Sequence, residues 1–265
     1  MGEVALMKFA LVQYTSENGK AHHFISDIIR LLYLSLIDLG HSCCICHNQI
    51  IPDRINILFS WVRLPPDAID SLILKKIPYI VFQPEILSEK GLNDTTQMNW
   101  DIHLPYIWKL FSHSLQIWEL FDFNLPILQE KNLRAKILPL GYHPKLESSL
   151  PPKPIYDAVF FGSHSPYRKS LFEKLSQKGI ELNNVNFAPN LFRDDLLRKS
   201  RISLNIPLND TKMFHVSPNR VAAGLYHGVP TVSLQCRCSS WLKPMLHMLD
   251  TNNFVEELQI YLVKR

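Results

Sequence analysis

A glycine and an arginine follow the apolar segment DAVFF, at Gly162 and Arg168, where a strand is predicted to give way to a helix. Glycine has no side chain, so the backbone there can approach a ligand closely. The first N–H groups of the following helix are unpaired and lie at the positive end of its dipole. Arg168 can add a bidentate contact to the same anion. This combination suits a diphosphate; the alternative is a tight turn with Arg168 in solvent.

A second candidate is the stretch FHVSPNRVAAGLYHG. Ser217 or Asn219 can cap a helix that begins near Arg220, and such a cap leaves other N–H groups of the first turn free for an anion. Gly224 lets this helix pack closely. An ordinary capped helix is the alternative reading of the same residues.

Candidates for acid–base chemistry lie after two predicted strands. Glu17, His22 and His23 stand in the polar loop TSENGKAHH, and Glu85 follows PYIVFQP. A carboxylate or imidazole near an acceptor hydroxyl can serve as its base. His143, at the end of ILPLGYH, is a further candidate. Each of these residues can instead be a solvated loop residue or a helix cap.

A metal site is not expected. The five cysteines form the groups SCCICH and CRC, and side chains of a strand alternate between its faces, so only Cys44 and Cys46 of the first group share one. That is poor geometry for tetrahedral zinc. The leader MGEVAL is too short and carries the wrong charge for a signal peptide, so an intracellular, cytoplasmic protein with reduced thiols is expected.

Strands and helices must position these residues, and the chain alternates between them. The first half predicts a doubly wound α/β pattern, in which residues 100–111 form a helix or a loop. The proline-rich segment 143–157 reads as a linker, after which the alternation restarts. Strands are predicted at 8–14, 42–47, 55–62, 78–85, 114–120, 135–142, 157–163, 185–188, 201–207 and 229–234, and helices at 24–40, 64–76, 125–131, 167–178, 192–200 and 220–228.

Composition limits the classes of protein. The 265 residues are 46% hydrophobic and 20% charged, enough for one large or two small domains with a good core. The net charge of +4 is spread along the chain, which does not indicate a nucleic-acid groove but allows small anionic ligands. The longest apolar stretch, 24–40, contains Asp27, Arg30 and Asp38, so a core helix is expected and no membrane insertion.

The order of three segments carries a family resemblance. YDAVFFGSHSPYRKSLFEKL, LLRKSRISLNIP and HVSPNRVAAGLYHGVPTVS resemble the C-terminal, donor-binding domain of GT-B glycosyltransferases, particularly spore-maturation-type and family-four-like enzymes. YIVFQPE and ILPLGYHP resemble the strand loop and interdomain crossing of their N-terminal domain. The resemblance implies two Rossmann-like domains, residues 1–145 and 155–265, facing each other across a cleft. It allows the last helix to pack back on the first domain.

The resemblance also implies a function. The second half would hold a nucleotide-diphosphate sugar, and the first would present the acceptor, which can be a saccharide, a lipid carrier, a protein, a small molecule or a modified base in DNA. No cofactor beyond this co-substrate and no divalent metal is required, since no Asp-x-Asp signature is present. Catalytic candidates are Glu17, His22 and Glu85. The donor-side candidates are Gly162, Ser163, Arg168, His215, Ser217, Asn219, Arg220 and Gly224.

One departure leaves the nucleotide open. Many members of the family carry a glutamate in the first turn of the second helix, which holds the ribose, but Val221, Ala222 and Ala223 follow Arg220 here. Ribose recognition would have to come from elsewhere. A sugar-nucleotide epimerase and a non-catalytic nucleotide-sugar-binding protein are the alternatives. The absence of G-x-G-x-x-G and of G-x(4)-G-K-[ST] counts against dinucleotide oxidoreductases and P-loop NTPases.

Overall fold

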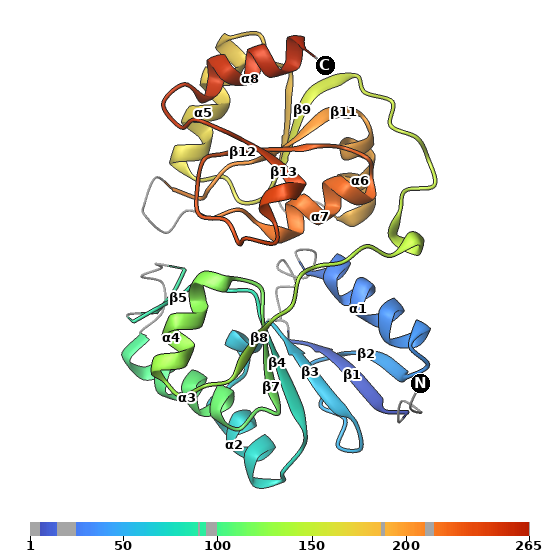
Figure 1. Ribbon diagram of the computed structural model, residues 1–265, viewed down its shortest axis with the longest axis vertical. Coiled ribbons are helices and arrows are strands. Elements are labelled where there is room, and N and C mark those ends of the chain that lie inside the picture. The colour runs from blue at the N-terminus through green and yellow to red at the C-terminus, as the bar shows by residue number, and fades with distance from the viewer. Residues whose placement is uncertain are drawn as a thin grey trace. The chain divides into compact units, whose positions relative to one another are not determined.

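The chain forms two compact units, residues 1–143 and 144–265, each built on its own parallel sheet (Figure 1). The structure is a computed structural model. It describes residues 6–14, 25–89, 91–93, 100–186, 189–209 and 215–264.

The first unit has a six-stranded parallel sheet in the order β2-β1-β3-β4-β7-β8. Most of the predicted elements are confirmed. Strand β3 ends before the predicted residue 62, because Ser60 takes a φ of 54° and a 3-10 turn follows. The elements are β1 (Lys8–Gln13), α1 (Ser26–Asp38), β2 (Ser42–His47), β3 (Ile55–Phe59), η2 (Trp61–Arg63), α2 (Pro66–Leu74), β4 (Tyr79–Gln83), β5 (Leu87–Ser88), β6 (Gly91–Leu92), α3 (Trp100–Ser112), β7 (Gln116–Glu119), η3 (Asp122–Asn124), α4 (Leu125–Glu130) and β8 (Ala135–Ile137).

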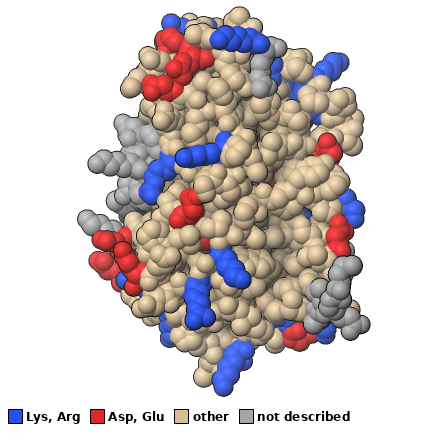
Figure 2. Space-filling view, viewed as in Figure 1, with Lys and Arg blue, Asp and Glu red and all other residues tan. Residues whose placement is uncertain are grey.

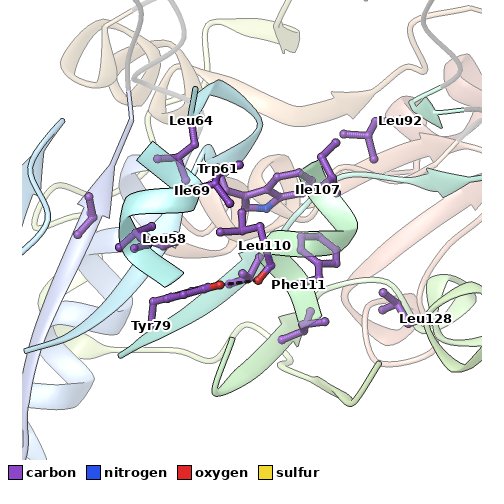
Figure 3. Close-up of a cluster of buried hydrophobic side chains, with 14 of the residues drawn as sticks. Leu58, Trp61, Leu64, Ile69, Tyr79, Leu92, Ile107, Leu110, Phe111 and Leu128 are labelled. Atoms are coloured by element: carbon purple, nitrogen blue, oxygen red, sulfur yellow. Dashed lines mark hydrogen bonds between the residues drawn. The ribbon is translucent and has the colours of Figure 1, made fainter. Parts of the chain in front are cut away.

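Two aromatic side chains with polar groups tie the core of this unit together (Figure 3). The Tyr79 hydroxyl donates to the Leu110 carbonyl oxygen at 2.7 Å, and the Trp61 indole N–H donates to that of Phe82 at 3.0 Å. The Trp61 ring also meets Phe111 edge-on, with centroids 4.9 Å apart. Large aromatic surface is therefore buried without leaving its polar atoms unpaired.

The second unit has a five-stranded parallel sheet in the order β10-β9-β11-β12-β13. Two sequence predictions were wrong here. Strand β10 lies three residues before the predicted 185–188, and β13 is a strand that was not predicted. The elements are η4 (Pro144–Leu146), β9 (Tyr156–Phe161), α5 (Pro166–Gln177), β10 (Leu182–Val185), α6 (Asn190–Arg198), β11 (Ser200–Asn205), α7 (Pro218–Tyr226), β12 (Thr231–Leu234), η5 (Lys243–Met245), β13 (Leu246–Leu249) and α8 (Phe254–Val263).

Helix α7 packs closely on the sheet at Gly224. A Cβ atom at this glycine would lie 2.7 Å from the Val229 carbonyl oxygen and 2.8 Å from Thr231 Oγ1. The close packing expected of Gly224 is therefore present. Helix α8 buries Phe254 and Leu258 in the core of the second unit itself.

The surface carries mixed charge. On the face shown in Figure 2, Lys and Arg side chains are interspersed with Asp and Glu and separated by uncharged residues. Among the helices of the described ranges, none combines the length and hydropathy that a membrane crossing requires.

A carboxyl group is fully buried at the end of β7. Glu119 accepts a hydrogen bond from the Phe121 N–H at 2.8 Å through Oε1, whereas Oε2 has no partner among the described residues. Burial raises the pKa of Glu119 well above its usual range, although bonds from Phe121 and Asn124 oppose the shift. Burial therefore favours the protonated, uncharged form of this side chain.

Glu119→Gln should flatten the pH dependence of stability. A carboxyl whose pKa is raised by folding contributes its full stability below the unfolded pKa of about 4.3, and this is lost as pH rises through the folded pKa. Glutamine cannot ionise. Between about pH 4.5 and pH 8, the free energy of unfolding should therefore fall less in the variant than in the parent chain. Urea titrations at a series of pH values measure this, with exposed Glu130→Gln as the charge control. If the free energy of unfolding changed equally with pH in Glu119→Gln and in the parent chain, the prediction would be contradicted.

Candidate functional site

Two buried arginines lie at the carboxyl ends of strands in the second unit. Arg168 comes from α5 and Arg220 from α7, and each is only 5% exposed. The guanidinium carbon of each lies 4.9 Å from the centroid of the Phe160 ring, at the end of β9. The fold thus brings together two arginines that were predicted as donor-side residues from two separate segments of the sequence.

Arg168 joins the loop after β9 to the loop after β11. Its Nε donates to the carbonyl oxygens of Ile206 and Pro207, both at 3.0 Å, and its Nη2 to that of Ile206 at 2.7 Å. Its Nη1 donates to the Ser163 carbonyl oxygen at 2.7 Å. Arg168 is therefore not in solvent; it fixes two loops and keeps part of its hydrogen-bonding capacity.

Arg220 lies directly against Gly162. A Cβ atom on that glycine would stand 2.7 Å from Arg220 Nη2, and the glycine φ of 143° disfavours any other residue. The Arg220 Nε donates to the Phe161 carbonyl oxygen at 3.0 Å, and Nη1 to Asn205 Oδ1 at 2.9 Å. The glycine is needed here so that the guanidinium can reach the backbone at the end of β9.

Neither guanidinium has a negative partner among the described residues; their acceptors are carbonyl oxygens and the neutral amide of Asn205. Burial lowers the pKa of Arg168 to about 10. Burial, and secondarily Arg168, lower the pKa of Arg220 well below its usual range. Cys236 does not supply the missing charge, because burial raises the pKa of its thiol to about 11. Positive charge buried in this way favours a bound anion.

The first turn of α7 holds further unused polar atoms. Ser217 occupies the N-cap position, but its side chain makes no capping bond, contrary to the prediction that it could. Its N–H donates instead to Asn205 Oδ1 at 3.1 Å. Asn219 Oδ1 is buried and has no partner among the described residues. His215 forms an isolated bridge with Arg237, which anchors the segment that leads into the helix.

The loop after β9 contains a histidine that the sequence reading did not single out. Ser165 Oγ caps α5 by accepting from the Arg168 N–H at 3.2 Å. The ring of His164 meets Phe172 edge-on, and its Nε2 is buried without a partner among the described residues. Burial, then the charges of Lys169 and Arg168, lower the pKa of His164. The uncharged form of the imidazole is therefore favoured.

The residues predicted to act on the acceptor lie in different places, and some of them are not described by the structure. Glu17, His22 and His23 lie outside the described residues. Glu85 is half-buried in the loop after β4, where burial raises its pKa against the opposing effects of Asn93 and Arg63. His143 Nε2 lies 2.8 Å from Asp38 Oδ2 at the end of α1. His143 thus has a partner within the first unit.

The sequence analysis also missed an asparagine that connects the end of β11 to the start of α7. Asn205 ends β11, is fully buried, and contacts Arg220, Ser217 and Ser233. Asparagine is depleted in strands, so its place at the end of the apolar run RISLN was a usable signal.

Comparisons with known proteins bear on the fold. No family model matches the chain. No curated protein matches it either. Among solved structures, it is similar to AviGT4, a glycosyltransferase involved in avilamycin A biosynthesis, with a TM-score of 0.54 and 13% sequence identity over 97% of this chain and 88% of that one. With its two parallel sheets, the chain therefore has a two-domain Rossmann-like fold that a glycosyltransferase shares.

Proposed function

We propose that the chain is a glycosyltransferase that moves a sugar from a nucleotide-diphosphate sugar to an acceptor, with the donor held by the second unit. The observation that carries the proposal is the pair Arg168 and Arg220, buried at the carboxyl ends of parallel strands without a carboxylate partner among the described residues. Ligands of open α/β sheets bind at this edge. The fold shared with AviGT4 supports the same reaction class.

The hydrogen bonds of the two arginines leave donors for a diphosphate. A guanidinium has five N–H groups. Arg220 uses Nε and one hydrogen of Nη1, which leaves both hydrogens of Nη2 beside Gly162. The Ser217 hydroxyl, at the N-cap of α7, can donate a further neutral hydrogen bond to the diphosphate, whereas the unpaired Asn219 Oδ1 can only accept one from a hydroxyl group of the donor. We propose Gly162, Ser163, Arg168, His215, Ser217, Asn219, Arg220 and Gly224 as the residues that form or shape the donor site.

Fixed positive charge is also what the reaction needs. When the bond to the sugar breaks, negative charge grows on the departing diphosphate, and preorganised guanidinium groups stabilise it. We propose that these arginines serve in place of a divalent metal. Glu17, His22 and Glu85 remain the proposed acceptor-side catalytic residues. The nucleotide, the sugar and the acceptor are to be identified with a panel of nucleotide sugars, in which binding without turnover would favour the alternative of a non-catalytic binding protein.

Arg220→Ala should weaken nucleoside-diphosphate binding by on the order of 2 to 4 kcal/mol, since a buried charged contact to phosphate is lost. Isothermal calorimetry with UDP, GDP, ADP and TDP measures the affinity. Arg220→Lys keeps the charge but not the planar fork, and should recover only part of it. Lys174→Ala removes an exposed positive charge of the same unit and is the control. Unchanged affinity in Arg220→Ala would refute the assignment.

Gly162→Ala should lower nucleotide affinity through the displacement of Arg220. Its Cβ would lie 2.7 Å from Nη2, whereas a Cβ at Gly179, which also has a positive φ of 76°, would meet nothing within 4 Å. Both variants should lose roughly 1 kcal/mol or more of folding stability from backbone strain. Only Gly162→Ala should lose affinity for the nucleotide. Equal affinities in the two variants would show that the glycine serves the turn alone.

A further inference from the structure

His164 belongs to the same aromatic cluster as the two buried arginines. Its ring meets Phe172 edge-on with centroids 5.6 Å apart, and the Phe172 ring lies 5.1 Å from that of Phe160. The guanidinium carbons of Arg168 and Arg220 each lie 4.9 Å from the centroid of the same Phe160 ring. Three basic side chains therefore lie around two aromatic rings. Two of them are fixed cations, whereas the imidazole can gain or lose its charge near neutral pH.

The loop that carries His164 is bonded to Arg168 on both sides of the histidine. The Ser163 carbonyl oxygen accepts from Arg168 Nη1 at 2.7 Å, and Ser165 Oγ accepts from the Arg168 backbone N–H at 3.2 Å. The guanidinium therefore lies against the peptide bond that joins residues 163 and 164. An anion bound by Arg168 would consequently be close to His164.

The surroundings of His164 oppose a positive charge on its ring. Nε2 is buried and has no hydrogen-bond partner among the described residues. A protonated imidazole has two N–H donors, so protonation would leave a charged donor unpaired and away from water. The ring packs on α5, and the charged side chains that act on it, Lys169 and Arg168, both belong to that helix. Burial, and then these two cations, lower the pKa of His164, so the uncharged form is favoured in the ligand-free protein.

We propose that His164 is a third anion-binding group of the donor site, and that it takes up one proton from solvent when a diphosphate binds beside Arg168 and Arg220. The nature of the anion rests on the proposed function. Negative charge next to the imidazole offsets the repulsion from Arg168 and Lys169, and a phosphate oxygen supplies the acceptor that Nε2 lacks. The protonated ring then contributes a positive charge and a hydrogen bond that the ligand-free site does not hold.

The test measures the pKa of His164 by NMR in protein labelled with ¹³C and ¹⁵N at histidine, where His164→Gln identifies the signal. The probes are UDP-, GDP-, ADP- and TDP-glucose, and sodium sulfate as a small dianion, since none of them titrates near neutral pH. A bound probe should raise the pKa of His164 by about one pH unit or more. Between the free and bound pKa values, the affinity of the parent chain should fall by up to about tenfold per pH unit as pH rises, because one proton binds with the ligand. In His164→Gln this pH dependence should be absent.

His247→Gln is the matched control, since His247 also stacks on an aromatic ring, that of Tyr261 at 4.9 Å, but is exposed. This variant should keep the pH dependence of the parent chain. A pKa of His164 that no probe raises, or an equal pH dependence of affinity in His164→Gln and the parent chain, would overturn the inference. If sulfate raises the pKa of His164 but no nucleotide sugar binds, the anion-linked protonation stands and the proposed transferase fails. If nucleotide sugars bind and are turned over while the His164 titration does not move, only the inference fails.

Discussion

The burial of two guanidinium groups around Phe160 is the constraint on which the second unit depends. Arg220 can reach the end of β9 only because position 162 has no side chain, and Arg168 holds the next loop in place through the carbonyl oxygens of residues 206 and 207. Two like charges in one apolar site oppose folding unless something else offsets them. Backbone carbonyls orient these charges but do not neutralise them.

Arginine is suited to such a site in a way that lysine is not. Some N–H groups of the planar guanidinium can donate hydrogen bonds to the protein while others remain available to a ligand. Asn205 is one of the protein groups that fix Arg220, since its amide oxygen accepts hydrogen bonds from both Arg220 and the N–H of Ser217. The first turn of α7 and the end of β9 are thereby fixed to each other before any ligand binds, which reduces the ordering that binding requires.

Local patterns predicted most of this fold because buried parallel strands are short apolar runs separated by helices of periodic pattern. Local patterns failed where the pairing with a neighbouring strand determines the structure. Strand β10 has the sequence LNNV, which has little strand character, and β13 is an edge strand that pairs with β12. The sequence placed Gly162, Arg168 and Arg220 near one another, since all follow strands that end at the same edge. That Arg168 would bond to residues 206 and 207 could not be predicted, because the pairing spans almost forty residues.

Neutral partners hold the basic groups of the second unit. Carbonyl oxygens and one asparagine orient the guanidinium groups, and the imidazole of His164 packs on the ring of Phe172. Neutral partners are a poor choice for stability alone, because an apolar replacement of similar shape removes the desolvation penalty altogether. Where folding keeps a charge oriented yet uncompensated, the remaining interaction energy is available to a ligand of opposite charge or with a matching hydrogen bond. For that reason this cluster, rather than the ion pairs on the surface, is where we place the donor site of the chain.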